Sequence, residues 1–186
     1  MYRATRTGRL TEGVRVRIIL PACQNGGETM LRGIDPLLGP DLLHALRAMG
    51  HGDEIAVVDA NYPATSSATR LIRIDGVDAV RVVDAILSVM PLDSFVEVAA
   101  FRMEVVGDAK KVPPVCREFE KVVQRRAPGQ TIAALERFKF YERAAHAFAH
   151  VATGERRLYG NLILKKGVVS PDETIEAAGS GRGRGR

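Results

Sequence analysis

The sequence predicts a single α/β domain in which a mixed central sheet of about six strands is flanked by helices. Three observations support this fold class. Apolar segments of strand length alternate with amphipathic segments of helix length. Some successive strands are not separated by a helix, which favours a mixed sheet over a purely parallel one. The chain has 186 residues, which is enough for one domain with a sizeable core.

The first predicted helix covers residues 39–50, GPDLLHALRAMG. Pro40 suits the first turn of a helix, and Gly50 follows the last apolar residue of the segment. The segment EIAVVDA at 54–60 is predicted to be a short buried strand, because its apolar residues are consecutive and β-branched residues are frequent. The segment TRLIRID at 69–75 is predicted to be a second strand.

The remaining elements alternate between helices and strands along the chain. The apolar residues of each predicted helix recur at intervals of three and four, whereas each predicted strand is a short apolar run. These elements are a helix over 78–90, a strand over 94–107, a helix opened by prolines over 113–127, a strand over 131–136, a helix starting at 138, and two strands within 147–167 around a Thr-Gly-Glu turn.

The net charge of +5 comes from the two ends of the chain. Residues 1–29 carry five Arg and two Glu, and residues 179–186 add three Arg, so each end contributes +3. Residues 30–178 hold 19 basic and 20 acidic residues, a net charge of −1. Binding of nucleic acid by the folded part would need a basic face. We therefore expect no nucleic-acid partner for the domain.

The two ends are predicted to lie outside the domain, which we place at 30–178. The regular pattern starts just after Met30, so residues 1–29 are predicted to be an N-terminal extension that is disordered or not native. A basic targeting segment is the alternative. The tail at 179–186, GSGRGRGR, is low in complexity and predicted to be disordered, with weak RNA contact as the alternative.

No apolar run approaches the roughly 18 residues that indicate a membrane span, so no membrane partner is expected. Cys23 and Cys116 make no disulfide framework, which favours the reducing cytoplasm. No spacing of His, Cys, Asp and Glu matches a metal site. Glycine-rich nucleotide loops and the G-x-S-x-G motif are also absent from the sequence. We therefore expect neither a metal nor a cofactor.

Polar residues gather on both sides of the predicted strand at 54–60. His51 lies directly after the predicted helix between two glycines, so its side chain can stand clear of the backbone. Asp53 is close enough in sequence to fix the tautomer of His51 and to favour its protonated form. His51 is thus a candidate proton-transfer residue. Alternatively, His51 is an ordinary polar loop residue beside a helix cap.

Asp59 ends the same strand. Ligands of open α/β sheets collect outside the carboxyl ends of the strands, where a carboxylate accepts hydrogen bonds from hydroxyl groups. The segment Asp-Ala-Asn-Tyr-Pro also suits a simple turn, and the spacing does not decide between the two. Two other segments offer hydrogen-bonding groups: Tyr159, Gly160 and Asn161 open the last strand, while Arg137 and Tyr141 lie one helical turn apart.

Several of these segments together resemble one family. The motifs MGHGDEI, DANYPA, LDSF, RFKFYERA and TGERRLYGNLILKKG occur in the order and at the spacing seen in the fucose mutarotase and ribose pyranase family. The resemblance covers about residues 30–168. It implies the fold of that family and a cofactor-free isomerase that interconverts ring forms of a monosaccharide. It also implies a homo-oligomer, because family members assemble as rings, often decamers, with pockets at subunit contacts.

The resemblance also implies roles for individual residues. His51 matches the proton-transferring residue, and Tyr141 or Tyr159 is the candidate second proton partner. Arg137 matches a position that is Arg in the fucose branch and His in the ribose branch. Asn61 stands where some relatives carry His. The implied catalytic residues are His51 and Tyr141, and the implied substrate contacts are Asp59, Asp93, Arg137, Tyr159 and Asn161.

The expected function is therefore interconversion of the α and β anomers of L-fucose by acid–base-catalysed opening and closing of the ring. A D-ribose pyranase, or a mutarotase of another monosaccharide, is the nearest alternative. A sugar-binding accessory protein without turnover is a further alternative, and a pure binder would have no need of His51.

Overall fold

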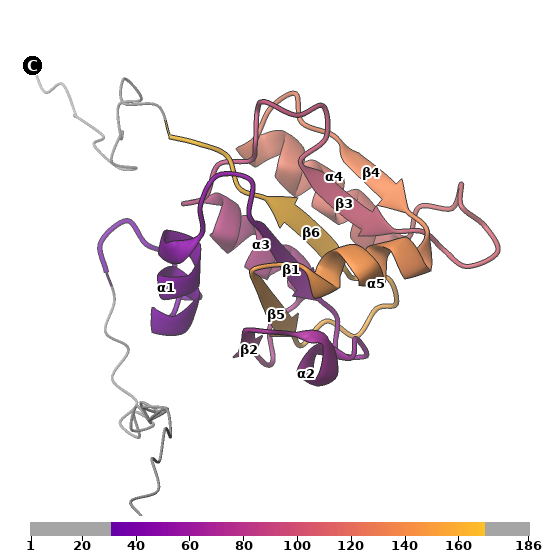
Figure 1. Ribbon diagram of the computed structural model, residues 1–186, viewed down its shortest axis with the longest axis horizontal. Coiled ribbons are helices and arrows are strands. Elements are labelled where there is room, and N and C mark those ends of the chain that lie inside the picture. Colours follow the sequence, from indigo (N-terminus) through magenta and orange to yellow (C-terminus); the bar gives the residue numbers. More distant parts are fainter. Residues whose placement is uncertain (1–30, 170–186) are drawn as a thin grey trace, which may run out of the picture.

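The computed structural model describes residues 31–169, so the predicted extension at 1–29 and the predicted tail at 179–186 lie outside the described residues. Within this range the chain forms one six-stranded sheet in the order β2-β5-β1-β6-β3-β4 (Figure 1). The strands are β1 (Glu54–Val58), β2 (Leu71–Ile74), β3 (Ala100–Met103), β4 (Ile132–Leu135), β5 (Ala149–Thr153) and β6 (Leu162–Lys165). The helices are α1 (Pro40–Ala48), α2 (Ala64–Ser67), α3 (Ala79–Leu87), α4 (Pro114–Arg126) and α5 (Arg137–Ala145).

The sheet is mixed, as predicted. Strand β1 pairs in parallel with β5, β5 pairs in parallel with β2, and β3 pairs in parallel with β4. Strand β6 lies between β1 and β3 and is antiparallel to both. Because β6 alone runs the other way within this sheet, it places its first residues beside the end of β1 and its last residues beside the start of β1.

The sheet separates two apolar layers. Ile55 and Val57 of β1 face the larger layer, which packs against α1, α3 and α4, whereas Ala56 and Val58 face the smaller layer under α5. This alternation follows from the two-residue period of a strand. Figure 1 shows α5 on one side of the sheet and α3 and α4 on the other. Since β1 is buried on both faces, its sequence is a continuous apolar run.

Two predicted elements differ from the structure. The predicted strand over 94–107 is shorter, because only Ala100–Met103 joins the sheet as β3. The side chain of Asp93 accepts a hydrogen bond from the Phe95 amide, and such a local side-chain bond competes with strand pairing. The four-residue helix α2 was not predicted from the sequence.

The two strands predicted around the Thr-Gly-Glu turn do not form a hairpin. Strand β1 lies between β5 and β6 in the sheet. Gly154 in the intervening segment donates its amide to the carbonyl of Val77 at 2.8 Å. A Cβ atom on Gly154 would stand 2.7 Å from the backbone nitrogen of Gly76, so a glycine is needed for this close approach. The segment therefore packs against the loop before α3 and carries the chain across β1.

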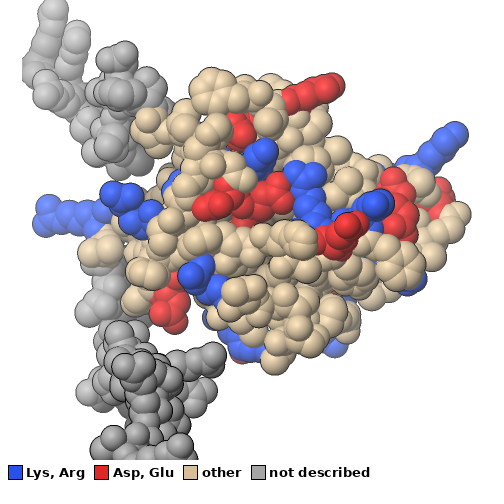
Figure 2. All heavy atoms as spheres, viewed as in Figure 1, with Lys and Arg blue, Asp and Glu red and all other residues tan. Residues whose placement is uncertain are grey.

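Charged side chains of both signs are mixed on the face of the molecule shown in Figure 2. That distribution agrees with the near-neutral composition of residues 30–178. Between residues 31 and 169, no helix has the length and apolar character needed to cross a bilayer.

A buried histidine lies in the smaller layer. The His150 side chain on β5 is fully buried, and neither ring nitrogen has a hydrogen-bond partner in the described part of the chain. Its ring centroid lies 5.7 Å from that of Tyr62. Burial lowers the pKa of the His150 imidazole, because the charged form would lose its hydration.

We predict that His150 makes the fold sensitive to acid. The unfolded chain takes up a proton at His150 below about pH 6.5, while the folded chain does not until a lower pH. The free energy of unfolding should therefore fall as the pH drops below about 6.5, by roughly 1.4 kcal/mol for each unit by which burial lowers the pKa. Urea unfolding at pH 7.5 and pH 5.5 measures this loss.

The variant His150→Leu should show a smaller loss of stability between the two pH values. His146→Gln is the matched control, because His146 is exposed at the end of α5 and should leave the pH dependence unchanged. An equal loss in wild type and His150→Leu would contradict the prediction.

Candidate active site

The loop between α1 and β1 presents His51 to solvent. Gly52 has a positive φ of 86°, a conformation that glycine adopts without steric cost. The Gly52 amide donates to the carbonyl of Lys166, and the Lys166 amide donates to the carbonyl of Asp53. The His51 side chain is 45% exposed. The end of β6 therefore fixes the loop while the imidazole remains accessible.

The carboxylate partner of His51 is Asp93 rather than Asp53. The Asp53 side chain accepts a hydrogen bond from the Gly50 amide at 2.7 Å, so the predicted role of Asp53 in fixing the His51 tautomer is wrong. His51 Nε2 lies 3.1 Å from Asp93 Oδ1, and the edge of the Phe95 ring packs against the imidazole. Two residues far apart in sequence thus form one hydrogen-bonded pair.

Asp93 is ionised in this arrangement. Its side chain is 2% exposed, and burial by itself opposes ionisation. Hydrogen bonds from the Phe95 amide and from the His51 ring, together with the charges of His51 and Lys165, outweigh burial and hold the pKa of Asp93 below its usual range. A charged Asp93 can orient the His51 ring and stabilise its protonated form.

A second polar group lies at the other end of β1. Asn161 donates from Nδ2 to Asp59 Oδ2 at 2.7 Å, and its Oδ1 accepts from the Asp59 amide at 2.9 Å. The Asn61 amide donates to Asp59 Oδ1 at 2.9 Å. Burial raises the pKa of the Asp59 carboxyl, and these hydrogen bonds offset the effect only in part.

The Tyr-Gly-Asn segment before β6 has an unusual backbone. Tyr159 has a φ of 66°, and its hydroxyl accepts a hydrogen bond from the Val106 amide at 3.2 Å. A Cβ atom on Gly160 would lie 2.5 Å from Glu155 Cγ, so only glycine fits there. This segment therefore brings Tyr159 and Asn161 to the same side of the sheet edge as Asp59.

These residues line a pocket of about 180 Å³. That volume is below the roughly 300–1,000 Å³ of pockets for drug-sized ligands, so it suits a small ligand. Five of the predicted site residues lie in its wall: Asp59, Arg137, Tyr141, Tyr159 and Asn161. Met103, Val106 and Leu158 add apolar surface. Arg137 begins α5, and in the described part of the chain it forms no ion pair.

Tyr62 is a pocket residue to which the sequence assigned no role. It lines the same pocket, and burial raises the pKa of its phenol. Its hydroxyl is buried without a hydrogen-bond partner among residues 31–169. Its ring lies 5.4 Å from the ring of Tyr141. The motif DANYPA contained the only signal, because a Tyr a few residues after a strand end can reach a ligand there.

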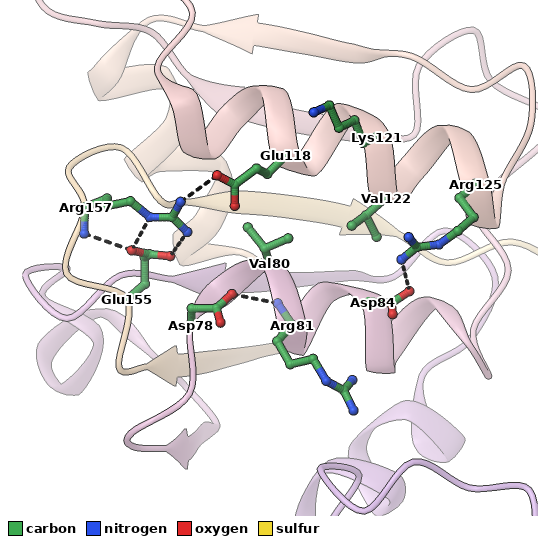
Figure 3. Close-up of a pocket in the computed structure, with 10 residues that line it drawn as sticks. All are labelled: Asp78, Val80, Arg81, Asp84, Glu118, Lys121, Val122, Arg125, Glu155 and Arg157. Carbon is green, nitrogen blue, oxygen red and sulfur yellow. Dashed lines mark hydrogen bonds and ion pairs between the residues drawn. The ribbon is translucent and has the colours of Figure 1, made fainter.

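A larger groove of about 550 Å³ lies between α3 and α4 (Figure 3). Three of its acidic side chains are already held by arginines, since Glu118 and Glu155 contact Arg157, and Asp84 contacts Arg125. The fourth, Asp78, accepts a hydrogen bond from the Arg81 amide at the start of α3. None of the predicted site residues lines this groove. We therefore assign its charged residues to the packing of the two helices rather than to ligand binding.

The two polar clusters lie at opposite ends of β1. His51 precedes the strand and Asp59 follows it, and a five-residue strand spans roughly 13–17 Å. Within one chain, the pocket thus gathers five predicted residues, while His51 and Asp93 form a separate pair. Over the described residues, no group of three or more His, Cys, Asp or Glu could hold a metal ion.

Comparison with known proteins identifies the family. Residues 32–169 match the RbsD/FucU transport protein family. The chain belongs to this family. It is 47% identical over 146 residues to the fucose mutarotase of Homo sapiens, an alignment that covers 75% of this chain and 95% of the human protein.

Two solved structures of the RbsD/FucU family are also similar. The fucose mutarotase of Streptococcus pneumoniae in complex with L-fucose has a TM-score of 0.70 and 45% identity, and covers 75% of this chain and 100% of that chain. RbsD of Bacillus subtilis complexed with D-ribose has a TM-score of 0.57 and 21% identity, and covers 72% of this chain and 95% of that chain. The second likeness concerns the fold alone. The predicted family and fold class are confirmed.

Proposed function

We propose that the protein is an L-fucose mutarotase that interconverts the α and β anomers by opening and closing the sugar ring. The observation that carries this proposal is the pocket at the end of β1, in which Asp59, Arg137 and Asn161 offer acceptors and donors for hydroxyl groups. Relatives at this level of identity are named fucose mutarotases, and one of them was solved with L-fucose.

The reaction needs two proton transfers and no electron transfer. The anomeric hydroxyl loses a proton while the ring oxygen gains one, and the bond between the anomeric carbon and the ring oxygen breaks. The free aldehyde rotates about its C1–C2 bond and the ring closes on the other face. A positioned acid–base group typically accelerates such steps by about 10²–10⁴, and an imidazole titrates in the suitable pH range.

The pocket is suited to hold the hydroxyls away from the reacting carbon. Asn161 orients the Asp59 carboxylate through two reciprocal hydrogen bonds, so Asp59 is preorganised to accept from the sugar. Arg137 supplies a donor without a competing ion pair in the described residues. Tyr141 lies beside Tyr62 and is our candidate for the second proton partner. The Tyr159 hydroxyl retains donor capacity because it accepts from Val106.

We further propose that a second copy of the chain supplies His51 to this pocket. His51 cannot reach Asp59 of its own chain, because β1 lies between them. Exposed apolar side chains occur beside both clusters: Phe95 is 72% exposed next to His51, and Leu158 is 67% exposed at the pocket. A head-to-tail contact between two unlike surfaces generates a ring when its rotation closes. In this arrangement Asp93 orients His51 and does not itself contact the sugar.

The number of subunits in such a ring, decameric or other, stays a prediction from the resemblance. The cytoplasmic location, which we infer from the sparse cysteine content, also stays a prediction. Cys116 is a free, buried thiol, in line with that inference.

His51→Ala should abolish catalysed exchange of L-fucose anomers. Saturation-transfer NMR on the purified full chain measures the exchange rate, and we expect a loss of about 10²–10⁴ because the proton carrier is removed. His44→Ala is the control, since His44 is exposed on α1 and outside both clusters. Unchanged exchange in His51→Ala would refute the assignment. Exchange of D-ribose faster than L-fucose in wild type would favour the ribose activity.

Affinity for L-fucose should depend on the ionisation of Asp59. Burial raises the pKa of the Asp59 carboxyl, so as the pH falls the carboxylate form is lost at a higher pH than in an ordinary aspartate. Calorimetric titration should show weaker binding at pH 5 than at pH 7.5. Asp59→Asn should bind roughly tenfold more weakly at pH 7.5, because a neutral acceptor replaces a charged one. Binding by Asp59→Asn that varies with pH as in wild type would contradict this role.

Two impaired variants should complement each other, at an L-fucose concentration too low to saturate Asp59→Asn, if the site is shared between subunits. Co-expression of His51→Ala with Asp59→Asn should restore about a quarter of wild-type exchange under random mixing. In that fraction of contacts a chain with intact His51 faces a chain with an intact pocket. Separately purified variants provide the baseline. A mixture no more active than its components would show that the site is complete within one chain.

A further inference from the structure

A lysine shares the carboxylate that contacts His51. Lys165 Nζ lies 3.9 Å from Asp93 Oδ2, while His51 Nε2 lies 3.1 Å from Asp93 Oδ1. The two side chains therefore approach different oxygens of one carboxylate. Asp93 is 2% exposed and the Lys165 side chain is 24% exposed, so water screens their interaction only in part.

The backbone fixes this arrangement. Lys165 is the last residue of β6 and pairs with Glu54 at the start of β1. The Asp93 amide donates to the Lys165 carbonyl at 3.1 Å, and the Lys165 amide donates to the carbonyl of Ala99. Gln130 donates from its side chain to the Asp93 carbonyl at 3.3 Å. Strand β6 thus holds both the loop that carries Asp93 and the lysine that faces it.

We propose that Lys165 is a positioning residue that sets the proton affinity of His51 by sharing the Asp93 carboxylate. A carboxylate beside an imidazole stabilises the protonated form of the ring, and a nearby ammonium opposes that effect. Lys165 takes up part of the negative charge of Asp93 and repels a proton on His51. The imidazole can then both accept and donate a proton, as repeated opening and closing of the sugar ring requires.

The other charged groups near His51 have partners of their own. Lys166 donates to the carbonyls of Leu46 and Met49 at the end of α1, and burial lowers its pKa. Asp53 accepts from the Gly50 amide on the same loop. The charge of Arg47 lowers the pKa of Lys166, whereas the charge of Asp53 raises it. On the Asp93 side, Lys165 is the cation besides His51 that contacts the carboxylate among the described residues.

The test removes the charge of Lys165 and keeps its length. In Lys165→Met, the ring C–H resonance of His51, assigned by its absence in His51→Gln, should titrate about half a unit to one unit higher in pH than in wild type. Lys165→Arg should titrate as wild type does, because the charge is kept. Lys121→Met is the matched control, since Lys121 is exposed on α4. If Lys165→Met does not fold, Lys165→Gln replaces it.

Activity gives a second readout, and this part rests on the proposed function. The acidic limb of the pH profile of kcat/KM should move upward by the same amount in Lys165→Met, so activity at pH 6 falls about three- to tenfold while activity at pH 8 is kept. An unchanged His51 titration, or an equal shift in Lys121→Met, overturns the proposal. If wild type shows no anomer exchange, the proposed function fails, and the His51 titration still decides the role of Lys165.

Discussion

The antiparallel pairing of β1 with β6 is the constraint on which both polar clusters depend. In this register Val57 pairs with Leu162 and Glu54 pairs with Lys165. The start of β6 therefore places Asn161 against Asp59, and its end places Lys165 and Lys166 against the loop of His51. A slip of one residue would turn every side chain of β6 to the opposite face. The burial of β1 and β6 on both faces of the sheet opposes such a slip, because polar side chains would enter the apolar layers.

The two aspartates of the clusters show how the environment divides one residue type between two roles. Both side chains are almost fully buried, at 5% and 2% exposed. Among residues 31–169, Asp59 has amide donors but no cation in contact, so burial prevails and its pKa is raised. Asp93 contacts His51 and Lys165 in addition to an amide, so ionisation prevails and its pKa is lowered. Pairs of carboxyls separated in this way are typical of acid–base sites.

Much of the fold could be predicted from the sequence, because periodicity reports burial directly. The six strands, the mixed sheet and the helices from α1 to α5 other than α2 follow from apolar spacing. The length of β3 did not, because the apolar pattern runs through 94–107 whereas only Ala100–Met103 pairs with neighbouring strands. The prediction of two paired strands around the Thr-Gly-Glu turn was wrong for a similar reason. A Thr-Gly-Glu segment suits a tight turn, and only the order of strands in the sheet shows that the chain crosses β1 there instead.

The sequence indicated which residues to consider for the candidate site, but not how the fold groups them. Asp59, Arg137, Tyr141, Tyr159 and Asn161 were singled out from motifs, and the fold brings them into one pocket. The partner of His51 could not be chosen correctly from sequence, because proximity along the chain favoured Asp53 while the sheet supplied Asp93.

The separation of His51 from the pocket has a chemical rationale under the proposed function. A mutarotase must hold the far hydroxyls firmly and leave the anomeric carbon free to rotate. A pocket formed by one chain can hold the far hydroxyls through the Asp59–Asn161 pair, which is buried and internally hydrogen-bonded. The proton carrier His51 then approaches from a loop that β6 holds in place. Because solvent reaches this loop, the imidazole can lose and regain its proton in each cycle. The strand pairing that separates these two functions within one chain also fixes each of them to the same rigid sheet.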